Sequence, residues 1–193
     1  MKKIKVLYII MLFSNLSFCQ FQSIDIAYQL INSFNRKDSS NIFYLRNTID
    51  YSRIVSDTTY IFADTANKKN DLFYKTDSLF THDDIKSFRE QLQKKIVQEW
   101  TDGKIINAIL IKENKFKRIF NQRTNEKSWN LFYKKYGKGF YVYSYPIFSE
   151  NLKKAIISIE YHCGGLCGSG GVYLFEFKDN NWVLLKTYSQ FTN

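Results

Sequence analysis

Proline and glycine are scarce in this sequence. The 193 residues include one proline, Pro146, and eight glycines, and no segment is rich in proline, glycine or serine. Such segments typically mark linkers between domains, and we also find no internal repeat. After a short targeting segment, we therefore expect residues 20–193 to form a single globular domain, which is long enough to bury a sizeable core.

Hydrophobic runs long enough to cross a membrane are also lacking. The apolar stretch Val6–Phe13 follows three lysines and is too short for a comfortable span. Together with the small-x-small site Ser17–Cys19, it predicts a signal peptide over residues 1–19 and a secreted or periplasmic protein. A lipid anchor on Cys19 is less favoured because bulky Phe18 precedes the cysteine, and an uncleaved anchor is the remaining alternative.

Catalytic and metal-binding motifs are missing as well. We find no Ser/His/Asp order, no pair of catalytic carboxylates and no HExxH motif, and no cofactor is indicated. The triplet His82-Asp83-Asp84 has the composition of a small metal cluster, but acidic residues also favour a helix N-terminus, which is the preferred interpretation. We therefore predict no metal site and lean towards a protein without enzymatic activity.

Cysteine, histidine and glycine are concentrated in residues 161–171, Tyr-His-Cys-Gly-Gly-Leu-Cys-Gly-Ser-Gly-Gly. Removal of Cys19 with the signal peptide leaves Cys163 and Cys167 as an even pair in an oxidising compartment, which favours a disulfide. The intervening glycines allow the Cα–Cα distance of about 5.5 Å that a disulfide needs. A redox-active disulfide, a three-ligand metal site that includes His162, and a nucleophilic cysteine with His162 or His82 as base are weaker alternatives.

The same run contains candidate ligand-binding residues. They are His162 and the glycines whose backbone N–H groups could hold an anion: Gly164, Gly165, Gly168 and Gly170. A strand rather than a helix is predicted to follow, which excludes a phosphate-binding P-loop. The simpler interpretation is that Gly168, Gly170 and Gly171 only shape a bulged hairpin tip.

Positive charge is concentrated in one segment. Between Lys104 and Lys138, ten basic residues face only Glu113 and Glu126, so the rest of residues 20–193 is close to neutral. Candidate anion-binding residues are Lys115, Lys117 and Arg118. For an exported protein, an anionic surface or polymer is a better candidate partner than nucleic acid. The simpler interpretation is a solvated strand face with its aromatic residues turned to the core.

The hydrophobic pattern predicts an α+β fold. Helices are expected over residues 24–35, from the cap Thr81 onwards with Asp84 completing a capping box, and over 126–136. A buried strand is expected over 105–111, followed by a strand and loop over 112–127, and short strands over 42–45, 51–55, 59–62 and 72–74. Strands over 140–145, 155–162, 172–177 and 182–188 complete the prediction. The result is an antiparallel β-meander of about four to six strands with two or three helices packed on it.

The C-terminal third resembles a group of small, uncharacterised exported bacterial proteins. Its most specific element is Cys163-Gly164-x-x-Cys167-Gly168-x-Gly170. Three weaker aromatic motifs accompany it: Trp129-x-x-Phe132-Tyr133-x-x-Tyr136-Gly137, Ser144-x-Pro146-x-Phe148-Ser149, and Lys178 ahead of Trp182. The resemblance covers about residues 126–188 and implies a shared sheet and hairpin, but no activity.

The sequence favours a non-enzymatic binding or interaction domain with a disulfide-clipped, glycine-rich hairpin. One alternative is an enzyme whose site lies at the hairpin tip and uses His162, Glu160 and Tyr161. The other is a basic protein that binds anionic envelope polymers or lipids. The partner itself is not identified by the sequence.

Overall fold

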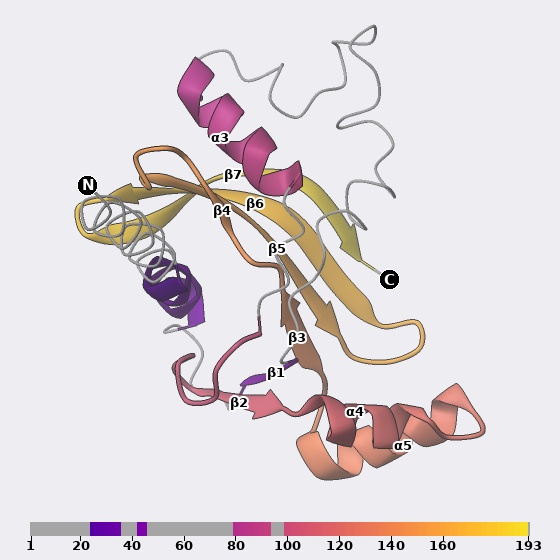
Figure 1. The fold of residues 1–193 in the computed structure, drawn as a ribbon. Coiled ribbons are helices and arrows are strands. Elements are labelled where there is room, and N and C mark those ends of the chain that lie inside the picture. The colour runs from indigo at the N-terminus through magenta and orange to yellow at the C-terminus, as the bar shows by residue number, and fades with distance from the viewer. Residues whose placement is uncertain (1–23, 36–41, 46–78, 94–98, 193) are drawn as a thin grey trace, which may run out of the picture.

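The α+β prediction is confirmed by the computed structural model, which describes residues 24–35, 42–45, 79–93 and 99–192. These residues form four helices and an open, mixed sheet of seven strands (Figure 1). The predicted signal peptide, with Cys19, and the predicted strands over 51–55, 59–62 and 72–74 lie outside the described residues. No helix in the described ranges is both long and apolar enough to cross a membrane.

The sheet combines an antiparallel meander with a small parallel part. Its order is β2-β1-β3-β5-β6-β7, and β4 also pairs with β5. The strands are β1 (Ile42–Leu45), β2 (Ala108–Ile111), β3 (Phe140–Tyr143), β4 (Ile147–Phe148), β5 (Lys154–His162), β6 (Gly168–Lys178) and β7 (Asn181–Thr192). The predicted meander corresponds to β3 and β5–β7. The parallel pairing of β1 with both β2 and β3 was not predicted.

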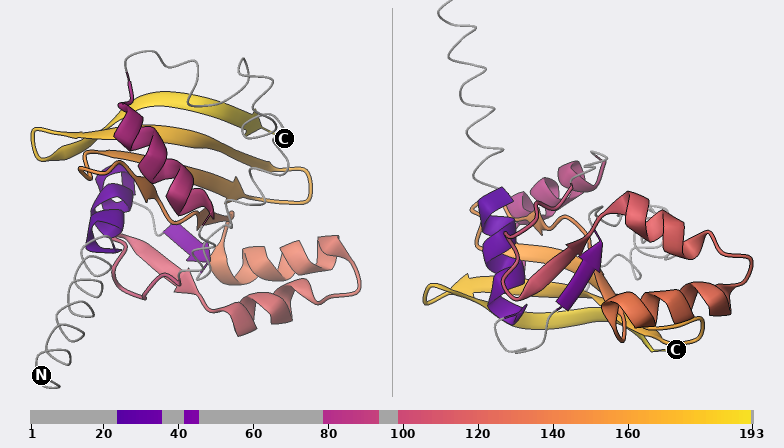
Figure 2. Two further views of the ribbon diagram at one scale, coloured as in Figure 1. Left: turned by 45° about the horizontal axis from the view of Figure 1, so that its top comes forward. Right: turned by 90° about the horizontal axis from the view of Figure 1, so that it is seen from below.

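Both faces of the central strands are buried. Along β5, Ala155 and Ile157 join one core cluster with the helix over residues 24–35, whereas Ile156 joins a second cluster with helix α3 (His82–Gln93). Successive strand residues point to opposite faces, so the two helices cover opposite sides of the sheet (Figure 2). This two-sided burial explains the continuous apolar run Ala155–Ile157 in β5.

Helix α3 begins at the predicted cap. The Asp84 backbone N–H donates to Thr81 Oγ1 at 3.1 Å, and the Thr81 N–H donates to Asp84 Oδ2 at 3.0 Å, which completes a capping box. Buried Asp84 also accepts an ion pair from Lys154 Nζ at 3.2 Å. Among the described residues, no group of three or more His, Cys, Asp or Glu side chains could hold a metal ion.

The basic segment is helical, so the predicted strand and loop over 112–127 was wrong. Helix α4 (Glu113–Phe120) packs against α5 (Asn125–Tyr136) as a helical hairpin beside the sheet (Figure 2). Phe116, Ile119 and Phe120 recur at helical spacing, and they contact a core cluster that includes Trp129 and Phe140. Burial of these three side chains on one face stabilises the segment as a helix.

Strand β6 starts earlier than predicted and includes the glycines. Gly168 pairs with His162, Gly170 with Glu160 and Gly171 with Ile159, in regular register. The interpretation of these glycines as a bulged tip is therefore wrong. The irregularities lie further along β6, where it faces β7, between Val172 and Tyr173 and between Leu174 and Phe175.

Candidate functional site

The turn between β5 and β6 is closed by a disulfide. Cys163 and Cys167 are bonded, with Cα atoms 5.0 Å apart, and the Cys163 N–H donates to the Cys167 carbonyl at 3.0 Å. The predicted disulfide is confirmed. The bond and the hydrogen bond constrain a loop of three residues, Gly164, Gly165 and Leu166. We call residues 163–167 the stapled tip.

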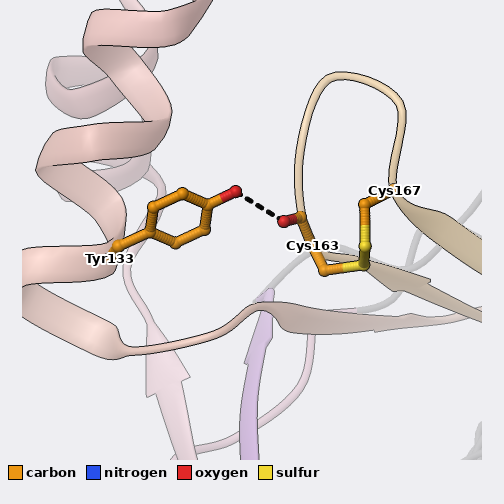
Figure 3. The surroundings of a disulfide bond; sticks show 3 residues. All are labelled: Tyr133, Cys163 and Cys167. Carbon is orange, nitrogen blue, oxygen red and sulfur yellow. Dashed lines mark hydrogen bonds between the residues drawn. A yellow bond between two sulfur atoms is a disulfide. The ribbon is translucent and has the colours of Figure 1, made fainter.

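Tyr133 of α5 holds the stapled tip in place. Its hydroxyl donates to the Cys163 carbonyl at 2.6 Å (Figure 3). A Cβ on Gly164 would lie 3.1 Å from this hydroxyl, and one on Gly165 would lie 3.2 Å from Asn125 Nδ2. These glycines therefore allow the tip to approach α5 closely. Sequence reasoning placed Tyr133 on the apolar side of the helix and missed this role, because helical spacing cannot reveal a hydroxyl contact with a distant loop.

His162 pairs with Glu160 on one face of β5. The distance between His162 Nε2 and Glu160 Oε2 is 3.0 Å, and the imidazole stacks on Phe140 with ring centroids 5.2 Å apart. Tyr161 lies between them in sequence, so strand alternation directs it to the opposite face, where it packs on Tyr141. The structure thus brings together two of the three residues of the enzyme alternative and separates the third.

The environment of Tyr161 also bears on the enzyme alternative. Partial burial raises the pKa of the Tyr161 phenol, and nearby Tyr133 adds to the rise. The phenol therefore stays protonated at neutral pH and is a poor general base there. The disulfide likewise occupies both thiols that the nucleophilic-cysteine alternative requires.

The candidate glycines occupy two different environments. Gly168 and Gly170 lie in β6, where Gly170 is paired with both β5 and β7 and Gly168 is paired with β5. Pairing uses backbone N–H groups in the sheet ladders, so these two glycines are poorly placed to cradle an anion. Gly164 and Gly165 are the candidate glycines that lie in the turn itself.

The candidate anion-binding residues share the exposed side of α4. Lys115, Lys117 and Arg118 are all exposed, and Lys117 pairs with Glu113 at 2.5 Å. An open hollow of about 580 Å³ is lined by Lys117 and Arg118 together with Asn114, Phe116, Phe120 and Asn121. Cationic, amide and aromatic side chains thus line one hollow.

The positive surface extends over the whole helical hairpin. Nine exposed cations lie between residues 112 and 138, against the two carboxylates Glu113 and Glu126: Lys112, Lys115, Lys117, Arg118, Arg123, Lys127, Lys134, Lys135 and Lys138. We call this set the basic surface. Sequence reasoning located the charge but not its arrangement on two packed helices.

Comparison of the chain with protein-family models, curated proteins and solved structures finds no match. The resemblance of residues 126–188 to exported bacterial proteins therefore stays a prediction. The candidate site has to be interpreted from its own chemistry.

Proposed function

We propose that this protein is an exported, non-enzymatic binding domain that contacts an anionic surface or polymer through the basic surface of α4 and α5. The observation that carries the proposal is the exposure of all nine cations of this hairpin beside only two carboxylates. Opposite charges attract such a surface over about 10 Å at moderate salt, so it favours a partner with many negative groups.

The hairpin is well suited to present charge because its inner side is rigid. Phe120 packs edge-on against Trp129 with ring centroids 5.1 Å apart, and Trp129 stacks on Phe140 at 5.9 Å. A helical scaffold fixed by aromatic packing holds the backbone of each lysine in place, so binding orders side chains rather than whole segments. This arrangement supports recognition of an extended anionic surface more than recognition of one small ion.

Export is the second part of the proposal. It is supported by the predicted signal peptide over residues 1–19 and agrees with a disulfide at the stapled tip. Cleavage after Cys19 would give a mature protein that begins at Gln20, and the intact mass of the exported protein tests this. An acylated Cys19 at the N-terminus would instead establish the lipid-anchored alternative.

Binding of the processed protein to heparin and to phosphatidylglycerol vesicles over a salt series tests the proposed function. The variant Lys115→Gln/Arg118→Gln/Lys134→Gln/Lys135→Gln removes four cations of the basic surface. Each cation near an anionic surface contributes about 1 kcal/mol, so we expect vesicle binding to weaken on the order of a hundredfold or more. Binding of the unaltered protein should weaken steeply with salt.

A matched control removes four exposed lysines elsewhere: Lys86→Gln/Lys104→Gln/Lys153→Gln/Lys178→Gln. It makes the same change in net charge outside the basic surface, so we expect a much smaller loss of binding. Equal losses in the two variants would contradict a specific role for α4 and α5. Binding that is absent, or that salt does not weaken, would contradict the proposed function.

A further inference from the structure

We propose that the anionic partner is the surface of a lipid bilayer, and that Leu166 of the stapled tip inserts into its hydrocarbon boundary. This inference rests on the proposed function and names its partner class. The observation behind it is that the most exposed large apolar side chain of the described residues lies on a stapled loop next to the basic surface: Leu166 is 91% exposed.

The stapled tip presents Leu166 on a constrained backbone. The disulfide, the Cys163 N–H bond to the Cys167 carbonyl and the Tyr133 hydroxyl bond to Cys163 all restrain the three-residue loop. Glycine-rich loops of this length are otherwise mobile, and ordering them on binding costs free energy. A restrained loop therefore inserts an apolar side chain at lower entropic cost than a free one.

Two exposed aromatic side chains lie at the same end of the sheet. Pairing of Gly170 with Phe191 places that ring, 43% exposed, three residues along β6 from the tip. Tyr133, 40% exposed, contacts the tip directly. Leucine, phenylalanine and tyrosine beside lysines are the combination that proteins use at the boundary between headgroups and acyl chains.

The basic surface and the stapled tip are neighbours in space. Figures 1 and 2 place the β5–β6 turn and the α4–α5 hairpin at the same end of the molecule, and the Tyr133 contact joins them. Lys134 follows Tyr133 in α5 and is exposed. Lysine ammonium groups can thus contact lipid phosphates while Leu166 reaches the acyl chains below the phosphates.

A bilayer explains the leucine better than a soluble polyanion does. A sulfated or phosphorylated polymer offers no apolar phase, so Leu166 would contribute almost nothing to binding it. A bilayer removes the side chain from water, and complete burial of a leucine strengthens binding by about tenfold or more. The two partners therefore predict different effects of the same substitution.

The test compares Leu166→Ser with the matched control Leu184→Ser. The control removes an exposed leucine from β7, near the end of the strand opposite to Phe191. The processed protein is titrated with phosphatidylglycerol vesicles and, separately, with heparin. We expect Leu166→Ser to weaken vesicle binding about tenfold and to leave heparin binding unchanged. We expect Leu184→Ser to change neither. Unchanged thermal melting of both variants would show that the fold is intact.

A second readout reports insertion directly. The native indoles of Trp100, Trp129 and Trp182 are buried, so the indole introduced by Leu166→Trp should dominate any change in fluorescence on vesicle binding. We expect a blue shift and quenching by lipids brominated on the acyl chains. The same substitution at Leu184 should give neither.

The outcomes separate this inference from the proposed function. If Leu166→Ser binds vesicles as tightly as the unaltered protein, while the four-cation variant loses binding, the basic surface stands and insertion is wrong. If Leu166→Ser weakens heparin binding equally, the tip contacts a polymer and the bilayer is wrong. If the four-cation variant binds both probes normally, the proposed function itself fails.

Discussion

Gly170 lets an aromatic ring lie against the backbone of β6. A Cβ at this position would lie 2.7 Å from a Phe191 ring carbon and 2.9 Å from the Ile159 carbonyl oxygen. Both distances are shorter than real contacts, and the carbonyl belongs to a paired strand that cannot retreat easily. The absence of a side chain at position 170 thus leaves the space that the Phe191 ring occupies.

The substitution Gly170→Ala should therefore destabilise the protein by about 1–3 kcal/mol, the usual cost of overpacking. Urea unfolding measures this change. Combination with Phe191→Ala should recover part of the loss, because the close contacts with the Phe191 ring disappear and the one with the Ile159 carbonyl remains. Ser169→Ala, one residue earlier in β6, serves as the control and should have little effect. If Gly170→Ala leaves the free energy of unfolding unchanged, the Phe191 ring and strand β5 can move away from position 170 without cost.

The stapled tip should stabilise the β5–β6 hairpin by restricting the unfolded chain. For so short a loop, we expect Cys163→Ser/Cys167→Ser to lower the free energy of unfolding by about 2 kcal/mol. Reductant should produce the same loss in the unaltered protein and none in the double variant. An unchanged melting temperature of the double variant, with two free thiols in the unaltered protein by mass, would contradict a stabilising disulfide.

Local sequence patterns predicted most of the helices and strands, whereas pairings between segments far apart in the sequence were not predicted. The Thr81–Asp84 capping box and the β-branched run of β5 identified α3 and the meander from sequence. Helix α4 was not predicted, because the segment was interpreted from its charge. The spacing of Phe116, Ile119 and Phe120 does indicate a helix. The glycines of β6 were expected in a turn, but pairing with β5, and for Gly170 and Gly171 also with β7, overrides their low β-propensity.

The candidate site was likewise predicted only in part from the sequence. The even pair of cysteines expected after export predicted the disulfide, and composition predicted the basic segment. The separation of Tyr161 from His162 and Glu160 follows from alternation along the predicted strand 155–162. The contact of Tyr133 with the tip depends instead on which strands and helices become neighbours. One sequence contains no record of such neighbours when the pairing partners lie far apart along the chain.

Buried tyrosines link the stability of the whole domain to alkaline pH. Burial raises the pKa of Tyr44 and Tyr143 far above the ordinary value of 10, and raises that of Tyr188 to about 12. The unfolded chain then loses these protons at lower pH than the folded chain does. Stability is therefore unaffected by these groups below about pH 10 and falls as the pH rises from there through the folded-state values.

We expect unfolding above pH 10, followed by circular dichroism, to coincide with the last part of the rise of tyrosinate absorbance, to which the buried phenols contribute. Tyr188→Phe should shift the transition to higher pH, since one phenol with a raised pKa is removed. The same variant should cost little stability at neutral pH, because the buried Tyr188 hydroxyl has no hydrogen-bond partner among the residues described. Completion of the tyrosinate absorbance rise well before unfolding would contradict the link between burial and alkaline stability.

The position of β1 affects the order in which the chain can fold during synthesis. β1 lies between β2 and β3, and Tyr44 pairs with both Leu110 and Tyr141. A strand made early in translation thus cannot complete its pairing until residues around 141 have emerged. The β5–β7 meander joins neighbours in sequence and closes short loops, so it can form independently and quickly. We expect refolding to proceed from the C-terminal meander towards the parallel strands, with β1 docking last.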